Sequence, residues 1–212
     1  MAEKLNPEVI ARTALRLLGE KGVDGLTMRA LAAQLDVQAA TLYWHVASKE
    51  QLFRAMASIM NTDAAALMTA ADRRAPGREC IRRWARALRD TMLSHRDGAR
   101  VFAGVHSVDP VGFEVIEAVL DAWRDTGLSA AEAAQRTALL RSFIVGFCIE
   151  AQGIADLRDH TESGRMDEFL TAVNPKRFPL VAQALPILLG TTAAEHFELG
   201  LTLMLGGPTS AD

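Results

Sequence analysis

The sequence predicts an all-α fold of about nine to ten helices, with a small N-terminal three-helix headpiece and a larger C-terminal helical domain. Hydrophobic residues recur at helical spacing along most of the chain. Nearly every break between these stretches carries an N-cap residue, a proline or a glycine. No segment shows the strict alternation of a β-strand. Half of the 212 residues are hydrophobic, which is enough to bury a sizeable core.

The first helix is predicted to begin at Asn6 and Pro7, an N-cap followed by a proline at the first helical position. Ile10, Ala14, Leu17 and Leu18 then form an apolar stripe along one side, and Gly22 is expected to end the helix.

The segment Thr27 to His45 is predicted to form two short helices joined by a tight turn, a helix-turn-helix. Thr27 can cap the first helix, while Leu26 packs on Leu31 as a hydrophobic staple. Asp36 follows that helix and tolerates the left-handed conformation that a sharp turn requires. Val37 and Leu42 are expected to supply the inward side of the second helix, which leaves polar and aromatic groups on the outer side.

Those outer groups are small or flat enough to enter a DNA major groove. Gln38 suits a base edge, and the methyl groups of Ala39 and Ala40 suit a thymine methyl. Hydroxyl and imidazole groups nearby can reach phosphates, and Lys49 can hold one at the start of the next helix. The predicted DNA-binding residues are Arg29, Gln38, Ala39, Ala40, Thr41, Tyr43, Trp44, His45 and Lys49. The alternative is an ordinary helical hairpin whose aromatic residues are half-buried.

Charge sets a limit on the nucleic-acid hypothesis. The net charge is −3, and residues 1–66 balance seven basic against seven acidic side chains. Any DNA binding must therefore depend on locally placed groups, with a moderate dependence on salt. Because one short helix offers little affinity or specificity, a dimer on two half-sites is expected.

The remaining helices are also marked by caps. Ser48 and Gln51 form a capping box that opens a long connector helix, and Ser129 and Glu132 open a long apolar one. Residues 156–174 carry no long apolar period and are expected to form a loop. The further helices are predicted at 48–67, 78–94, around 101–102, from Asp109–Pro110 to about 123, 129–155, 175–189 and 192–206.

An enzyme is not expected. The series Ser94-His95-Arg96-Asp97 suggests a catalytic triad, but neighbours at one helix end do not converge in space, and Asp97 is expected to cap the next helix. The chain has no phosphate-binding glycine loop and no paired-histidine metal motif. Its two cysteines are expected to be reduced, buried thiols. With no signal peptide or bilayer-length apolar run in this sequence, a cytoplasmic location is expected.

The segment LTMRALAAQLDVQAATLYWHVASKEQL resembles the DNA-binding domain of the TetR family of bacterial repressors. Its TLYWHV run is especially similar to the tetracycline repressor branch, as are LSHRDGARV and FCIEAQG further on. The resemblance implies a homodimer on a palindromic operator, with DNA contacts from the nine residues above. It also implies residues 1–47 as the DNA-binding domain, 48–212 as the ligand-binding and dimerisation domain, and a four-helix bundle built from about 129–155 and 192–206 of each subunit.

The resemblance also implies an effector site, where this sequence departs from the tetracycline repressors. Those proteins bind a drug–magnesium chelate, and their metal-ligand histidine corresponds to Phe102, which cannot coordinate a hard cation. Tetracycline–Mg²⁺ is therefore not expected, no metal is predicted, and the effector is expected to be largely apolar. The predicted ligand-binding residues are Ala65, Trp84, Leu88, Phe102, Val105, Phe113, Val119, Phe147 and Glu150.

Three alternatives stay open. Glu150, the acidic residue kept from the branch, can either meet the ligand or remain a partly solvated acid at the dimer seam. An activator of the same fold would have the same sequence features. A helical protein that sequesters a small molecule without binding DNA is the competing functional class.

Overall fold

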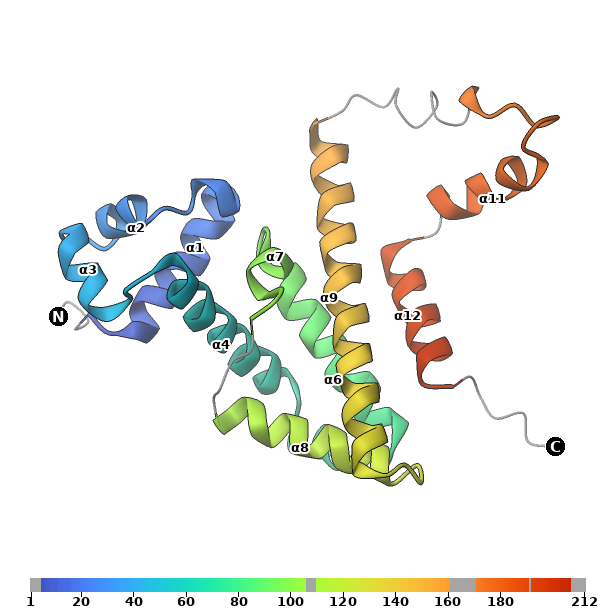
Figure 1. Ribbon diagram of the computed structural model, residues 1–212, viewed down its shortest axis with the longest axis horizontal. Helices are drawn as coiled ribbons and strands as arrows, with labels where there is room; N and C mark the ends of the chain where they lie inside the picture. Colours follow the sequence, from blue (N-terminus) through green and yellow to red (C-terminus); the bar gives the residue numbers. More distant parts are fainter. Residues whose placement is uncertain (1–4, 106–109, 161–170, 191, 207–212) are drawn as a thin grey trace. The chain divides into compact units, whose positions relative to one another are not determined.

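A computed structural model of the chain describes residues 5–105, 110–160, 171–190 and 192–206, and these residues form eleven helices without a strand (Figure 1). The all-α prediction is confirmed, with slightly more helices than the expected nine to ten. The chain divides into two compact units, residues 1–149 and 150–212, with the division inside the long helix α9. None of the described helices is long and apolar enough to cross a membrane.

The headpiece consists of α1 (Pro7–Gly25), α2 (Met28–Gln34) and α3 (Ala39–His45). Asn6 and Thr27 cap the first two helices through their side-chain oxygens, as the sequence predicted. Gly22 interrupts α1 at φ 68° and ψ 177°, so the regular helix breaks at the predicted residue before it resumes to Gly25. Asp36 adopts φ 53° between α2 and α3, which confirms the left-handed turn.

The connector helix α4 (Lys49–Leu67) leaves the headpiece and joins it to the rest of the unit. Ser48 Oγ accepts the N–H of Gln51 at 3.1 Å, while Gln51 Oε1 accepts the N–H of Ala47 at 2.9 Å, so the predicted capping box closes one residue earlier than expected. The helix packs against α1 and also against α6, α7 and α8. A tilt of α4 would therefore change its packing against α1 as well as against α6, α7 and α8.

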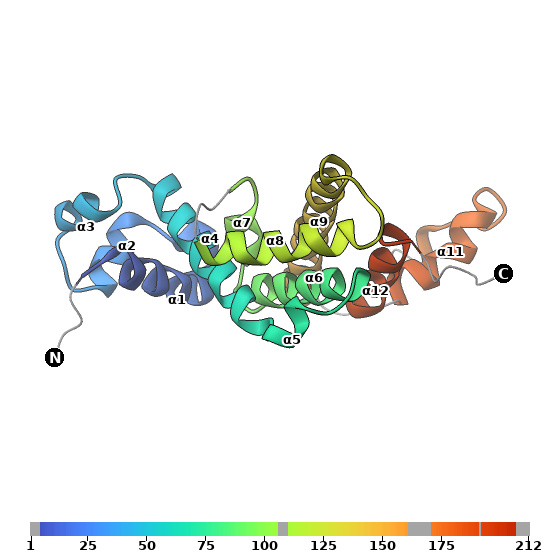
Figure 2. The same ribbon diagram turned by 90° about the horizontal axis from the view of Figure 1, so that it is seen from below.

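The rest of the first unit comprises α5 (Ala70–Arg73), α6 (Arg78–Leu93), α7 (Gly98–Phe102), α8 (Pro110–Arg124) and the first part of α9 (Ala130–His160). The four-residue α5 was not predicted, and its Thr69–Asp72 capping box explains why so short a helix forms. The helix α6 lies between α4 and α8 and buries an apolar face that includes Ile81, Trp84 and Leu88. Figure 2 shows α6 and α8 side by side.

The second unit contains the end of α9, α11 (Pro179–Gly190) and α12 (Ala193–Met204). The predicted Thr192–Glu195 capping box opens α12, with Glu195 Oε2 accepting the N–H of Thr192 at 2.9 Å. The loop prediction for residues 156–174 was wrong at residues 156–160, because α9 continues to His160, and at residues 171–172, which are also helical. Residues 161–170 and Asp109, which the sequence predicted to cap α8, lie outside the described residues.

Candidate nucleic-acid interface and regulatory core

The helix α3 buries a single side chain and exposes the rest. Leu42 is fully buried, and Val46 at the C-cap is 3 % exposed, so these two residues attach α3 to the headpiece. Tyr43 is 48 % exposed and Trp44 is 89 % exposed, a large exposure for an indole. The other predicted contact residues of this helix and its N-cap are exposed as well: Gln38, Ala39, Ala40, Thr41 and His45.

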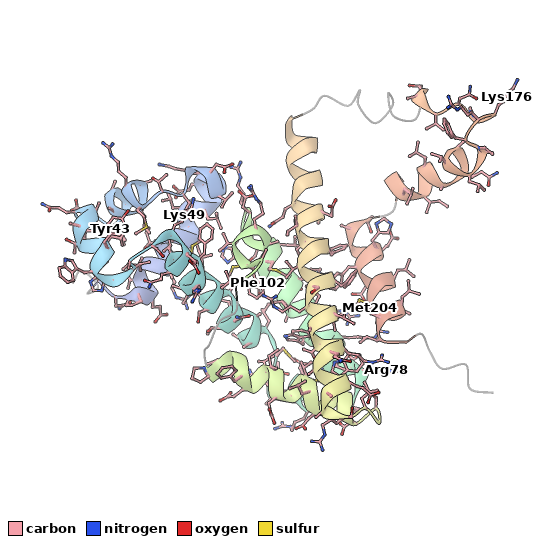
Figure 3. The ribbon with its side chains drawn as sticks, viewed as in Figure 1. Tyr43, Lys49, Arg78, Phe102, Lys176 and Met204 are labelled. Carbon is pink, nitrogen blue, oxygen red and sulfur yellow. The ribbon has the colours of Figure 1, made fainter. Side chains whose placement is uncertain are left out.

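The two basic residues Arg29 and Lys49, also predicted to contact DNA, lie on the neighbouring helices. Arg29 is exposed in the first turn of α2, and Lys49 is exposed at the first residue of α4. The Lys49 ammonium donates to the carbonyl oxygen of Val23 at 3.4 Å and lies 5.4 Å from the centre of the Phe53 ring. Figure 3 labels Tyr43 on α3 and Lys49 at the start of α4. An exposed cation that is held in place loses less side-chain entropy when it binds a phosphate.

A buried carboxylate that sequence reasoning assigned differently ties the headpiece to the core. Asp97 occupies the N-cap position of α7 at φ 54°, but its side chain makes no capping hydrogen bond. Instead, Asp97 Oδ2 accepts the N–H of Val23 at 2.8 Å, and Oδ1 accepts from Arg100 Nη1 at 3.2 Å. Asp97 therefore stands at the predicted N-cap position but does not cap α7 through its side chain, because its carboxylate bonds to α1 instead. Only a signal of tertiary contact would have revealed this bond, since the partners are 74 residues apart.

Both backbone polar groups of Val23 are consequently hydrogen-bonded to side chains from other parts of the fold. Its carbonyl oxygen receives Lys49 from α4, and its N–H reaches Asp97 before α7. Gly22 makes this approach possible, since a Cβ at that residue would lie 3.0 Å from Asp97 Oδ2.

The residues predicted to bind the effector fall into two groups. Five are buried in the core of the first unit, with exposures of 5 % or less: Ala65, Trp84, Leu88, Phe102 and Val119. They come from α4, α6, α7 and α8, helices that pack against one another. The remaining four are more open, since Val105 and Phe147 are half-buried, Phe113 is 57 % exposed, and Glu150 is exposed in the second unit.

Phe147 also pairs with a neighbour on its own helix, because its ring centre lies 6.1 Å from that of Phe143.

Sequence reasoning missed Arg141, a half-buried arginine of α9 at this core. Its Nη2 donates to the carbonyl oxygen of Val105 at 2.8 Å, and its guanidinium lies 5.1 Å from the centre of the Phe102 ring. Burial lowers the pKa of Arg141, since desolvation disfavours the charged form. A lone arginine in an apolar stretch of helix was the available signal.

The described residues contain no group of three or more His, Cys, Asp or Glu side chains suited to hold a metal ion. Phe102 is buried, and its phenyl ring has no oxygen or imidazole nitrogen with which to bind a hard cation.

The geometry defines a helix-turn-helix protein whose second helix is exposed and whose connector helix packs on a helical core. Residues 10–56 match the family described as bacterial regulatory proteins, tetR family, and residues 75–210 match the family described as tetracyclin repressor-like, C-terminal domain. The chain therefore belongs to the TetR family of bacterial regulators.

The curated relatives agree with this assignment over nearly the whole chain. The chain is 35 % identical over 206 residues to the tetracycline repressor protein class C of Escherichia coli, covering 96 % of this chain and 90 % of that protein. The class A tetracycline repressor protein from transposon 1721 in Escherichia coli gives the same identity over the same share of both chains.

The fold agrees as well with solved structures. A possible TetR family transcriptional regulator from Streptomyces coelicolor A3(2) is 37 % identical, with a TM-score of 0.81 over 94 % of this chain and 97 % of that one. The Streptomyces coelicolor TetR family protein ActR in complex with actinorhodin is 26 % identical, with a TM-score of 0.80 over 96 % of both chains.

Proposed function

We propose that this chain is a one-component transcriptional repressor that binds a palindromic operator as a homodimer and is released by a small, largely apolar effector. Residues 1–47 would form the DNA-binding domain, and residues 48–212 the ligand-binding and dimerisation domain. As a regulator, it would have no catalytic activity. The observation that carries the proposal is the exposed side of α3, where an indole is 89 % exposed among hydrogen-bonding neighbours.

The proposed operator contacts follow from chemistry and placement. Gln38 can bond a base edge, and the Ala39 and Ala40 methyl groups can contact a thymine methyl. Phosphates would be held by Lys49 and by the exposed N-terminal turn of α4, whose N–H groups favour an anion. The remaining proposed contacts are Arg29, Thr41, Tyr43, Trp44 and His45.

Exposed apolar side chains support dimerisation through α9 and α12. On α9, Leu139 is 63 % exposed on the side opposite to the buried Leu140 and Ile144. On α12, Leu199 and Leu203 are 57 % and 71 % exposed, while Phe197 and Leu201 are buried. Helices that are apolar on two sides are typical of bundle interfaces, and pairing α9 and α12 of two copies would bury these faces.

The connector helix would carry the signal. Because α4 packs against α1 and against α6, α7 and α8, a ligand among the core helices can change the angle at which α4 leaves the headpiece. The effector acts only through its preference for the DNA-free state, and a hundredfold preference corresponds to about 2.7 kcal/mol.

The effector would differ from the ligands of the tetracycline repressors. Phe102 and the buried Trp84, Leu88 and Val119 offer hydrocarbon and indole surface rather than metal or drug ligands. An apolar or aromatic molecule fits such walls. The similar protein ActR has been solved in complex with actinorhodin, so a protein of this fold holds a small molecule.

The test is an electrophoretic mobility shift with the DNA upstream of the chain's own gene. Tyr43→Ala should weaken binding by about 1–3 kcal/mol per half-site if the ring contacts DNA. Lys49→Met keeps the stem over Phe53 but removes the charge, so it should reduce the salt slope by about one for each half-site. Lys21→Ala, an exposed lysine of α1 outside the proposed contacts, is the matched control and should change little.

The outcomes separate the functional classes. No retarded band at low salt, with dimer present, contradicts the proposal. If the same protein shows a ligand-dependent rise in melting temperature, that combination would instead indicate a sequestering protein. A reporter gene downstream of the operator distinguishes repression from activation, since deletion of the regulator raises expression in the first case and lowers it in the second.

A further inference from the structure

Arg141 is a half-buried, positively charged side chain beside the proposed effector site. It comes from α9 and lies over the ring of Phe102, one of the residues proposed to line the effector site. Figure 3 labels Phe102 in the first unit. Among the described residues, no carboxylate forms an ion pair with Arg141. Because it is costly to remove a cation from water unless it is paired, a half-buried arginine favours an anionic partner.

Within the part of the chain that the structure describes, Arg141 donates one hydrogen bond. A guanidinium carries several N–H donors in a planar fork, and one of them bonds to the carbonyl oxygen of Val105 at 2.8 Å. That bond and the contact with Phe102, at 5.1 Å from the guanidinium carbon to the ring centre, restrict the movement of the group. A fixed planar donor next to a flat apolar ring suits a ligand that is itself flat and carries an anionic oxygen group.

We propose that Arg141 is a ligand-binding residue of the effector site and that the effector is an organic anion with a flat, largely aromatic body. This inference rests on the proposed function, since it takes the core of the first unit to be the effector site. The anionic group lies against the free edge of the guanidinium, and the aromatic body lies along the apolar side chains near Phe102. Desolvation of Arg141 strengthens its attraction for the anion, because the charge is only partly screened by water.

The test uses two fluorescent probes that share one aromatic body. Anilinonaphthalene sulfonate carries an anionic group, and phenylnaphthylamine is the same molecule without it. The full-length chain should bind the sulfonate at one site per chain more tightly than the neutral probe. Arg141→Met, which keeps the length of the stem, should weaken sulfonate binding about tenfold, equivalent to about 1.4 kcal/mol. Binding of the neutral probe should change by less than about twofold, because the apolar walls remain.

Two further variants control the interpretation. Arg136→Met removes an exposed arginine of the same helix, 5.6 Å from the Trp123 ring centre, and should leave both affinities unchanged. Arg141→Lys keeps the charge without the fork and should retain part of the preference for the sulfonate.

The results distinguish this inference from the proposed function. Equal binding of both probes, or equal loss of both in Arg141→Met, overturns the inference, since Arg141 then only supports the fold. An equal effect of Arg136→Met also overturns it, because the attraction is then general. Operator binding is measured on the same samples. If DNA binding is intact but the probes do not show the predicted difference, only the anion-site inference is overturned and the proposed regulatory function is unaffected. If the preference for the sulfonate depends on Arg141 but the protein does not bind DNA, the anion site is supported and the proposed regulatory function is contradicted.

Discussion

The hydrogen bond between Asp97 and the Val23 peptide should make Asp97→Ala one of the more destabilising changes on the polar side chains of this protein. Asp97 is 8 % exposed, and its Oδ2 accepts the Val23 N–H at 2.8 Å. Losing a charged acceptor from a buried N–H costs about 1.5–3 kcal/mol. The second bond, to an arginine whose side chain is 52 % exposed, adds little. We expect a loss of about 2 kcal/mol in the free energy of unfolding.

Thermal unfolding at fixed protein concentration measures this loss. For a chain of this size, about 2 kcal/mol corresponds to a fall in melting temperature of about 4–8 °C. Asp97→Asn keeps an oxygen acceptor and tolerates the left-handed backbone, so it should lose about half as much. Asp121→Ala is the control, since that carboxylate and its partner Arg124 are both more than 60 % exposed. If Asp97→Ala falls within about 0.5 kcal/mol of the control, the bond does not join the headpiece to the core.

Three other predictions concern single residues of the first unit. Gly22→Ala should destabilise the fold by about 1–3 kcal/mol in thermal unfolding, because φ 68° with ψ 177° is essentially a glycine conformation. Gly19→Ala is the control and should be neutral or stabilising, since no atom lies within 4 Å of the added Cβ. Burial raises the pKa of the Cys148 thiol to about 12 and also raises the pKa of Cys80. Neither thiol should therefore react with iodoacetamide at about pH 8 until the protein is unfolded. Rapid alkylation of the folded protein would contradict the burial of these cysteines. Burial lowers the pKa of His95 in the native state, so the unfolded chain binds the proton more readily. The free energy of unfolding should therefore fall as pH drops through about 6.5. His95→Gln should flatten this dependence of stability on pH, and an unchanged dependence would argue against the assignment to His95.

Local sequence signals predicted the headpiece well because its boundaries are set by local hydrogen bonds. The caps at Asn6, Thr27 and Ser48 and the left-handed turn at Asp36 each involve residues close in sequence. The helix α5 was missed because a four-residue helix has too short an apolar period to detect. The extension of α9 to His160 was missed because a polar helix end has no such period.

The site was harder to predict than the fold. The exposed side of α3 followed from helical geometry, since a single inward residue, Leu42, fixes which residues face outward. The roles of Asp97 and Arg141 depend on contacts across 74 and 36 residues, which no local pattern encodes. Which predicted effector residues touch a ligand remains a prediction, because burial alone does not define a binding site.

The most direct measurement is selection of bound duplexes from a random DNA library by the full-length chain, followed by sequencing. A dimeric helix-turn-helix reader should enrich an inverted repeat whose half-sites are centred about one helical turn apart, or a multiple of it. The Tyr43→Ala protein, selected in parallel, should enrich that repeat less strongly. Recovery of unrelated sequences, or of the same repeat with equal strength by both proteins, would contradict the assignment of α3 as the DNA-reading helix.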